Sequence, residues 1–227
     1  FPPRFFVRRP TLGNYMILPD LMSSLKVPLS RYVFNSVFIS VVSTFFYIII
    51  ATMAAFVMSK GKFKGRKVLF WIVQFALMFN AYTLAIPRYL IFAKMNIIDT
   101  YWVEILPHLA STLGVFLAKQ YIDGYIPNAL LEAAKIDGAT SGQILRKVTI
   151  PMVMPSITIC MFLSITNGFK LFDQNLSLTA GEPMKMSEMM ALNIYNTFYG
   201  RVGWEGVGQA KAVLFFLIVV GIGMWQL

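Results

Sequence analysis

Long apolar runs separated by short polar segments dominate the pattern of residues along this chain. Five apolar segments can be drawn, at residues 32–58, 68–93, 101–118, 151–172 and 211–227. About 20 helical residues cross a hydrocarbon core ~30 Å thick, so the first, second and fourth segments are long enough to span a bilayer. The third is shorter and contains Glu104, Pro107 and His108. No alternation typical of a β-barrel is present, so the pattern predicts an all-α integral membrane protein with about five transmembrane helices.

Composition agrees with this interpretation. The chain is 57% hydrophobic and only 13% charged, with a mean hydropathy of +0.66. A net charge of +10 would suggest nucleic-acid binding in a soluble protein, but here the cations lie in short loops beside apolar runs. Residues 60–67 alone carry five cations and mark a cytoplasmic loop. Counting spans from there places residues 119–150 inside and the loop at about 173–209 outside.

The first 30 residues are expected to form an external segment before the core. Their basic residues depart from the positive-inside pattern, which an additional span before Phe1 would accommodate. The chain opens without a Met and stops at Leu227 within an apolar run, so truncation at both ends is expected. In the external loop, an apolar periodicity from Ser187 to Gly200 predicts an amphipathic helix.

A polar island at about 122–150 separates the third and fourth apolar segments. Residues 128–137 are good helix formers that follow Pro127, and Gly138 stands where a helix end favours a left-handed residue. Residues 140–143, Thr-Ser-Gly-Gln, have the spacing of a capping box, so a second helix should begin there and run until Pro151 opens the next span. Helices of about ten residues are unstable alone in water, so both need a receptor surface, either a partner or the lipid headgroups.

The sequence contains few residues or motifs that would support a catalytic activity. The chain lacks the glycine-rich, lysine-containing motif of a phosphate-binding loop, so ATP would be bound elsewhere. One histidine, His108, and one cysteine, Cys160, leave no metal cluster or nucleophilic triad. We therefore expect no enzymatic activity, no catalytic residue, no metal and no cofactor in this chain.

The island resembles the EAA loop of binding-protein-dependent ABC importer permeases, whose transmembrane domains are of type I. The resemblance is carried by Glu132-Ala133-Ala134, by Gly138 four residues later, and by Val148-Thr149-Ile150-Pro151. In that family the loop docks into a cleft of a cytoplasmic ATPase and transmits its closure to the spans. The resemblance implies that residues 31–227 are the transmembrane domain and that the coupling residues are Glu132, Ala133, Ala134, Asp137, Gly138, Ala139 and Pro151.

The resemblance covers nearly the whole chain and narrows to sugar permeases of the maltose type. Up to about Asp137, with motifs at 31–36 and 118–123, the chain is similar to the second of the two permease subunits. From Ile150 onward, with motifs at 169–176 and 206–211, it is similar to the first. A divergent subunit, a hybrid and a composite sequence remain open.

The partners implied by the family are a second homologous permease subunit, two cytoplasmic ATPase subunits that bind ATP and Mg²⁺, and an external solute-binding protein. The substrate implied is a sugar, in particular an oligosaccharide, and the location is the bacterial plasma membrane. No nucleic-acid partner is expected.

Polar residues within the apolar segments are functional candidates because they are costly at membrane depth. Asn80 and Asn167 lie nearest the middle of their spans, and Tyr82 and Phe169 stand close to them in sequence. Amides and aromatic faces suit a sugar path, so these four residues are its candidates.

Glu104 and His108 are four residues apart and would share a helix face. They form either a proton relay, as an ion-coupled secondary transporter would need, or a pair that stabilises a kink. A purely structural membrane anchor is a third interpretation of the whole chain, one that would tolerate charge reversal at Glu132.

Overall fold

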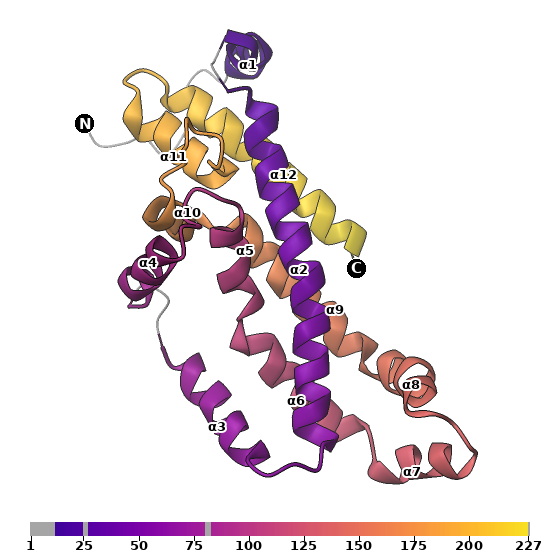
Figure 1. Ribbon diagram of the computed structural model, residues 1–227. Helices are drawn as coiled ribbons and strands as arrows, with labels where there is room; N and C mark the ends of the chain where they lie inside the picture. The colour runs from indigo at the N-terminus through magenta and orange to yellow at the C-terminus, as the bar shows by residue number, and fades with distance from the viewer. Residues whose placement is uncertain (1–11, 25–26, 80–82, 227) are drawn as a thin grey trace.

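The computed structural model describes residues 12–24, 27–79 and 83–226, and among these the regular elements are all helices, with no β-strand. Figure 1 shows the helices α1 (Gly13–Ser24), α2 (Leu29–Lys60), α3 (Arg66–Leu77), α4 (Ala85–Lys94), α5 (Trp102–Leu109), α6 (Thr112–Tyr125), α7 (Asn128–Ile136), α8 (Ser141–Ile144), α9 (Ile150–Phe169), α10 (Phe172–Leu178), α11 (Met190–Gly200) and α12 (Glu205–Gln226), with a π-helical turn at Leu145–Thr149. The all-α prediction is confirmed.

Three helices in the described residues are long and apolar enough to cross a membrane. They are α2, the continuous helix Gly142–Phe169, and α12. These correspond to the first, fourth and fifth apolar segments of the sequence. The amphipathic helix expected near residues 187–200 is α11.

The second and third apolar segments are not continuous helices, contrary to expectation. The second is divided into α3 and α4. Pro87 stands in the first turn of α4, where the backbone N–H that proline lacks would have no partner within the helix. The third is divided into α5 and α6, because Ser111 has extended backbone angles. α6 also continues past the expected limit of residue 118, to Tyr125. Hydrophobic periodicity alone did not predict the interruption between α3 and α4 or the one between α5 and α6.

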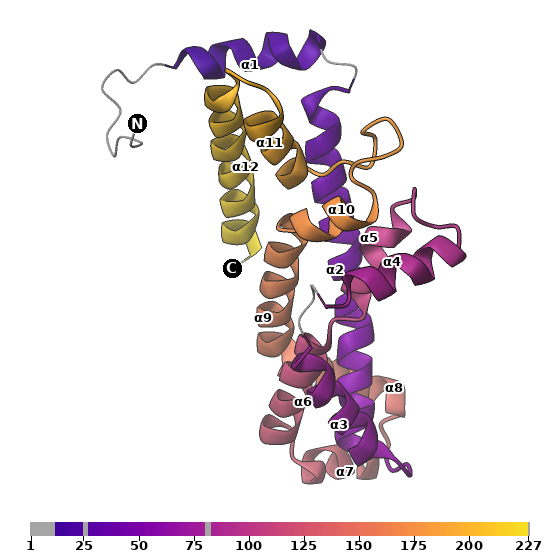
Figure 2. The same ribbon diagram turned by 90° about the vertical axis from the view of Figure 1, so that its left-hand side faces the viewer.

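α2 is the central element, and it runs nearly the length of the molecule in both views (Figures 1 and 2). It packs against α5, α6 and α9. Its contact with α9 is close: a Cβ added at Gly168 would lie 3.1 Å from the Cα of Ser40. Buried serines and glycines of this kind let two membrane helices approach without bulky side chains between them.

The two ends of the bundle differ. One end carries the 61–65 segment, α7 and α8, and we call it the loop end; the other carries α1, α11 and the start of α12 (Figure 2). The two basic segments, 60–67 and 119–150, therefore share one end, as the charge pattern predicts.

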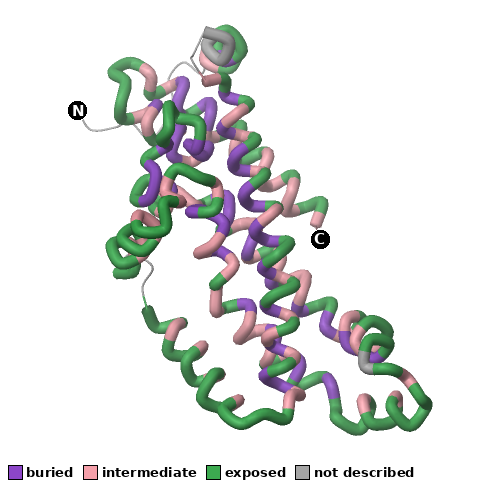
Figure 3. Tube along the Cα trace, viewed as in Figure 1, coloured by how far each residue is buried: buried purple, intermediate pink, exposed green. Residues whose placement is uncertain are grey.

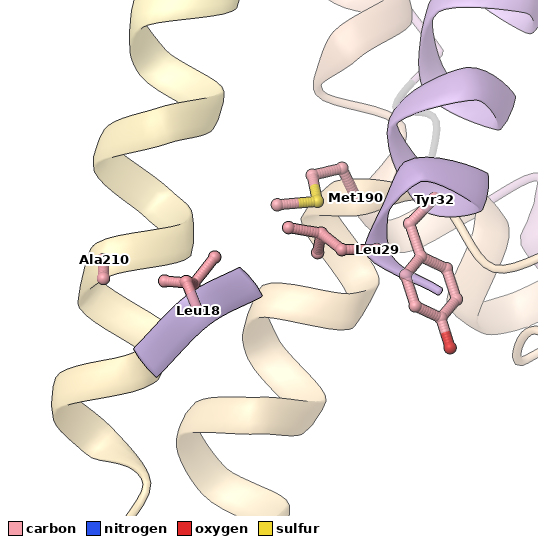
Figure 4. Close-up of a cluster of buried hydrophobic side chains, with 5 residues drawn as sticks. All are labelled: Leu18, Leu29, Tyr32, Met190 and Ala210. Atoms are coloured by element: carbon pink, nitrogen blue, oxygen red, sulfur yellow. The ribbon is translucent and has the colours of Figure 1, made fainter. Parts of the chain in front are cut away.

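Buried residues lie along α2 and between the helices that surround it, while α3, α4 and α7 are mostly exposed (Figure 3). One apolar cluster at the end opposite the loop end joins α1, α2, α11 and α12. Its members are Leu18, Leu29, Tyr32, Met190 and Ala210 (Figure 4). Through Leu18, α1 packs onto the rest of the bundle.

Candidate functional site

The polar island folds as a short helix, a tight turn and a second helix at the loop end. α7 ends in a Schellman motif, in which the Ala139 N–H donates to the Ala134 carbonyl at 3.0 Å and the Gly138 N–H donates to the Lys135 carbonyl at 3.0 Å. Gly138 has a φ of +79°, the left-handed conformation that this motif requires. The helix end predicted from the sequence at Gly138 is confirmed.

The second helix begins with the expected capping box. The Thr140 N–H donates to Gln143 Oε1 at 2.8 Å, and the Gln143 N–H donates to Thr140 Oγ1 at 3.3 Å. Each side chain thus satisfies a backbone donor of the other residue, which fixes the start of the helix. The turn between α7 and α8 is defined by hydrogen bonds on both sides.

Pro151 does not open a new span, contrary to expectation. It lies inside a helix that runs without interruption from the loop into α9. The helix passes through a π turn just before the proline, where the Ile150 N–H donates to the Leu145 carbonyl, five residues back. Because proline cannot donate a helical hydrogen bond, a locally widened turn accommodates it without ending the helix. The loop and α9 are therefore joined by one continuous helix.

Hydrophobic contacts anchor the start of the loop. Ile122 and Ile126, at 0% and 1% exposure, belong to a cluster that includes Val153 of α9 and Ala55 of α2. Leu131 of α7 packs against the same cluster. Through Leu131, a movement of α7 would therefore displace side chains that contact α2, α6 and α9.

A polar junction attaches the basic segment to the same place. Lys60 Nζ donates to the Ile126 carbonyl, and Asp123 accepts hydrogen bonds from Ser59 and Lys119. Burial alone would raise the pKa of Asp123, but the bonds from Lys119 and Ser59 together outweigh it and hold the pKa below its ordinary value. The ionised carboxylate thus ties the end of α2 to the end of α6.

The remaining surface of the loop is exposed. α7 has no buried residue, and Glu132, Ala133, Asp137 and Gly138 are all exposed. Ala134 and Ala139 are half-buried. Ile136 is 86% exposed, although an isoleucine side chain gains about 1.5–3 kcal/mol when fully buried. α7 therefore carries an acidic residue, Glu132, and an apolar residue, Ile136, on its exposed surface.

Of the four residues expected on the sugar path, the structure describes Asn167 and Phe169. Asn80 and Tyr82 lie outside the described residues. Asn167 is exposed and lines a cavity of about 160 Å³. Phe169 is only 1% exposed and packs edge-on against Phe215 of α12, so it belongs to the core in this conformation.

Glu104 and His108 are both buried, but they have separate partners. The Glu104 carboxylate accepts hydrogen bonds from Gln174 Nε2 at 3.0 Å and Asn175 Nδ2 at 3.1 Å. His108 Nε2 is 2.7 Å from Ser164 Oγ on α9. The carboxylate therefore fastens α10 to α5, and the imidazole fastens α5 to α9. No direct bond between the two side chains is present among the described residues.

Two amides, Asn175 and Asn35, hold the segment between α10 and α11. Asn175 donates to the Ser187 carbonyl and accepts from the Met189 N–H. Asn35 of α2 donates to the carbonyls of Met186 and Glu188 at 2.7 and 3.0 Å. An amide can bridge two backbone groups because it carries both donors and acceptors. Sequence alone offered only their presence near apolar segments as a signal.

Residues 48–226 match the protein-family model described as "Binding-protein-dependent transport system inner membrane component". The chain belongs to this family. It is therefore a multi-pass inner-membrane transport component of the ABC permease type and not an enzyme.

Two curated relatives are named as permeases for starch degradation products and for arabinooligosaccharides. The chain is 50% identical over 106 residues to AmyD of Thermoanaerobacterium thermosulfurigenes, a probable starch degradation products transport system permease. This match covers 47% of this chain and 36% of AmyD. It is 32% identical over 138 residues to AraQ of Halalkalibacterium halodurans, an arabinooligosaccharides permease, covering 61% of this chain and 49% of AraQ. The chain thus spans about half or less of the length of these relatives.

A solved structure shares the fold. A chain in the crystal structure of a bacterial alginate ABC transporter, in complex with an alginate pentasaccharide-bound periplasmic protein, matches with a TM-score of 0.71 at 17% identity. The match covers 98% of this chain and 87% of that one. At this identity the likeness establishes the fold, that of an ABC importer transmembrane domain.

Proposed function

We propose that this chain is a permease subunit of an ATP-driven importer of oligosaccharides. The observation that carries the proposal is the loop at about 122–150, which holds an exposed helix with a fixed turn, is anchored on α2 and α6, and is continuous with α9. Such an element can receive a push from another protein and pass it to the spans. Family membership and the sugars named for the relatives AmyD and AraQ support the same function.

In the proposed mechanism, α7 docks on a cytoplasmic ATPase that binds ATP and Mg²⁺. Glu132 lies in the docked surface, and Gly138 shapes the turn, with Asp137 beside it and with Ala133, Ala134, Ala139 and Pro151 completing the coupling motif. Closure of two ATPase subunits shifts α7, and the continuous helix transmits this shift to α9. The spans then alternate between an inward-facing and an outward-facing arrangement around a central path.

A second permease subunit completes the pathway in this proposal. α3 and α4 have no buried residue, and Trp71, Ile72 and Phe75 are 58–69% exposed. These surfaces are available to lipid and to a second subunit. An external solute-binding protein would deliver the sugar to the end opposite the loop end. Asn167, with Asn80 and Tyr82, stays a candidate for the path, whereas Phe169 would reach it only if α9 and α12 separate.

The test reverses the charge at the docking helix. We expect Glu132→Lys to lower ATP-driven uptake by about tenfold or more in the assembled importer, since a lost charge-assisted bond costs about 1.5–3 kcal/mol. Asp99→Lys is the matched control, because Asp99 is equally acidic and exposed but lies outside the loop. Uptake and ATPase activity are measured in proteoliposomes, with co-purification of the ATPase as the assembly check.

Two results would contradict the proposal. Full coupling in the Glu132→Lys variant would remove the role of the loop and would suit a structural anchor instead. Uptake that survives ATP depletion and collapses with the proton gradient would show an ion-coupled secondary transporter, the interpretation that assigns a relay to Glu104 and His108.

A further inference from the structure

A large cavity opens at the end opposite the loop end, and none of the site residues expected from the sequence is among its described lining residues. Its volume is about 1170 Å³, and it lies between the start of α2, the 184–188 segment, α11 and the second turn of α12. Sites for small ligands usually measure about 300–1,000 Å³, so this one has room for more than a single sugar ring.

The floor of the cavity is built from buried polar side chains. Lys211 of α12 is 4% exposed, and its Nζ donates to Asn193 Oδ1 and Thr197 Oγ1, both at 2.9 Å. Glu188 is 2% exposed and accepts hydrogen bonds from Asn193 and Asn196 of α11 at 3.3 and 3.0 Å. Two of the three donors of the Lys211 ammonium are used, and among the described residues none takes the third.

Burying charges this deeply is costly, and uncharged residues of similar volume often stabilise a protein equally well. The position at the edge of the spans makes the cost greater, and ionisable groups kept there mark functional sites. The floor presents amide, hydroxyl, ammonium and carboxylate groups within one cavity. This mixture matches the alternating donors and acceptors of sugar hydroxyl groups.

The charge of the lining is the second observation. Four cations line the cavity, Arg31, Lys185, Arg201 and Lys211, against the single carboxylate of Glu188. Cations concentrate on the cytoplasmic side of membrane proteins, and here the loop end holds the segments rich in them. A surplus of cations in a cavity at the other end therefore needs a local reason, and a negatively charged ligand supplies one.

Arg31 has spare capacity to bind such a ligand. Its Nη2 donates to the Tyr101 hydroxyl at 3.0 Å, but its buried Nε has no hydrogen-bond partner among the described residues. Arginine binds carboxylates through paired N–H groups, so a carboxylate here would satisfy an unused donor. Tyr32 also lines the cavity, and it belongs to the apolar cluster of Figure 4.

We propose that this cavity binds an acidic oligosaccharide, one whose sugar rings carry carboxylate groups, before it enters the spans. The inference rests on the proposed function and names its substrate class. Arg31, Arg201 and Lys211 meet the carboxylates, and Asn193, Asn196 and Thr197 meet the hydroxyl groups. A neutral oligosaccharide would leave the cation surplus uncompensated.

The test is direct binding to the assembled importer in nanodiscs, without ATP and without the solute-binding protein. The probes are a tetramer of galacturonic acid and the matched neutral galactose tetramer. The binding of each is measured by isothermal titration calorimetry. We expect the acidic tetramer to bind about tenfold or more tightly than the neutral one, with an affinity that falls as salt rises.

Three variants locate the site. Arg201→Gln and Arg31→Gln should each weaken binding of the acidic tetramer by about tenfold, which corresponds to loss of one charge-assisted hydrogen bond. Lys94→Gln is the control, since Lys94 is an exposed cation that does not line the cavity. Lys211→Met tests the floor, with thermal unfolding recorded alongside to separate misfolding from lost binding.

Several results would overturn the inference. Equal binding of the two tetramers would remove the acidic specificity, and unchanged binding in the arginine variants would remove the site. Binding of neither tetramer, with a tight cavity-dependent contact to the solute-binding protein instead, would make this a docking surface for that protein. If the cavity fails these tests while Glu132→Lys still uncouples ATP hydrolysis from uptake, only the substrate inference fails and the proposed function stands.

Discussion

Replacing Gly138 by alanine is expected to loosen the turn between α7 and α8 without a steric clash. A Cβ built at Gly138 meets no atom within 4 Å, so space is not the obstacle. The obstacle is the φ of +79°, because an L-residue in this left-handed conformation costs roughly 1–2 kcal/mol. That free energy corresponds to a factor of about 5–30 in the equilibrium between the closed and the opened turn.

The assay is hydrogen exchange of the loop amides in the assembled importer. The Ala139 amide reports the turn, because its bond to the Ala134 carbonyl exists only while the Schellman motif is closed. We expect Gly138→Ala to speed its exchange by about 5–30-fold. Gly138→Asn should have a smaller effect, since asparagine tolerates the left-handed region better than alanine. ATP-driven uptake should fall in the same order.

Gly142→Ala is the matched control. It too has open space around an added Cβ, but Gly142 lies in helical backbone without a positive φ, so alanine there should strengthen the helix by up to about 1 kcal/mol. If the Gly138→Ala turn exchanges as slowly as the wild-type turn, or if Gly142→Ala loosens it equally, the conformational argument is refuted.

Two further substitutions test the packing of the spans and the junction at the loop end. Gly168→Ala should destabilise the bundle by about 1–3 kcal/mol in thermal unfolding, because its Cβ would meet the backbone of Ser40, whereas Gly221→Ala, with open space, should be nearly neutral. An unchanged unfolding midpoint in Gly168→Ala would mean that α2 and α9 separate freely. Asp123→Asn should lower the midpoint at neutral pH only. Because the pKa of Asp123 lies below its ordinary value of 3.8, its ionised form stabilises the fold above that value, and this contribution is lost as pH falls through the folded pKa. The gap between wild type and variant should therefore close as the pH falls below 3.8 and through the folded pKa, and a gap that persists in more acidic solution would exclude the titration of Asp123 as its source.

Local features of the loop were predictable from the sequence because they depend on neighbours within a few residues. The end of α7 at Gly138 and the capping box of Thr140 and Gln143 each involve one turn of backbone. Hydrophobic length likewise predicted α2 and α9, although it also predicted a continuous span at residues 68–93, which the structure divides into α3 and α4. The resemblance carried by Glu132 and Gly138 indicated the family, and the match over residues 48–226 confirms it.

The sequence was least informative where backbone geometry overrode periodicity. The breaks between α3 and α4 and between α5 and α6 fall inside apolar runs, and the helix through Pro151 continues where a break was expected. Apolar length measures how favourable lipid contact is, and it does not report where a turn is stabilised by contacts with other helices.

By itself the sequence thus determined the class of the protein, the positions of its longest spans and the local shape of the loop between α6 and α9. Tertiary structure decided which elements are connected. It joins the loop to α9 through one helix, Glu104 to α10, and Lys211 to α11 at the floor of the cavity. The reason is sequence separation. Lys211 is paired with residues 14 and 18 positions away, and Glu104 with Asn175 at 71, distances at which no periodic pattern constrains which polar groups meet.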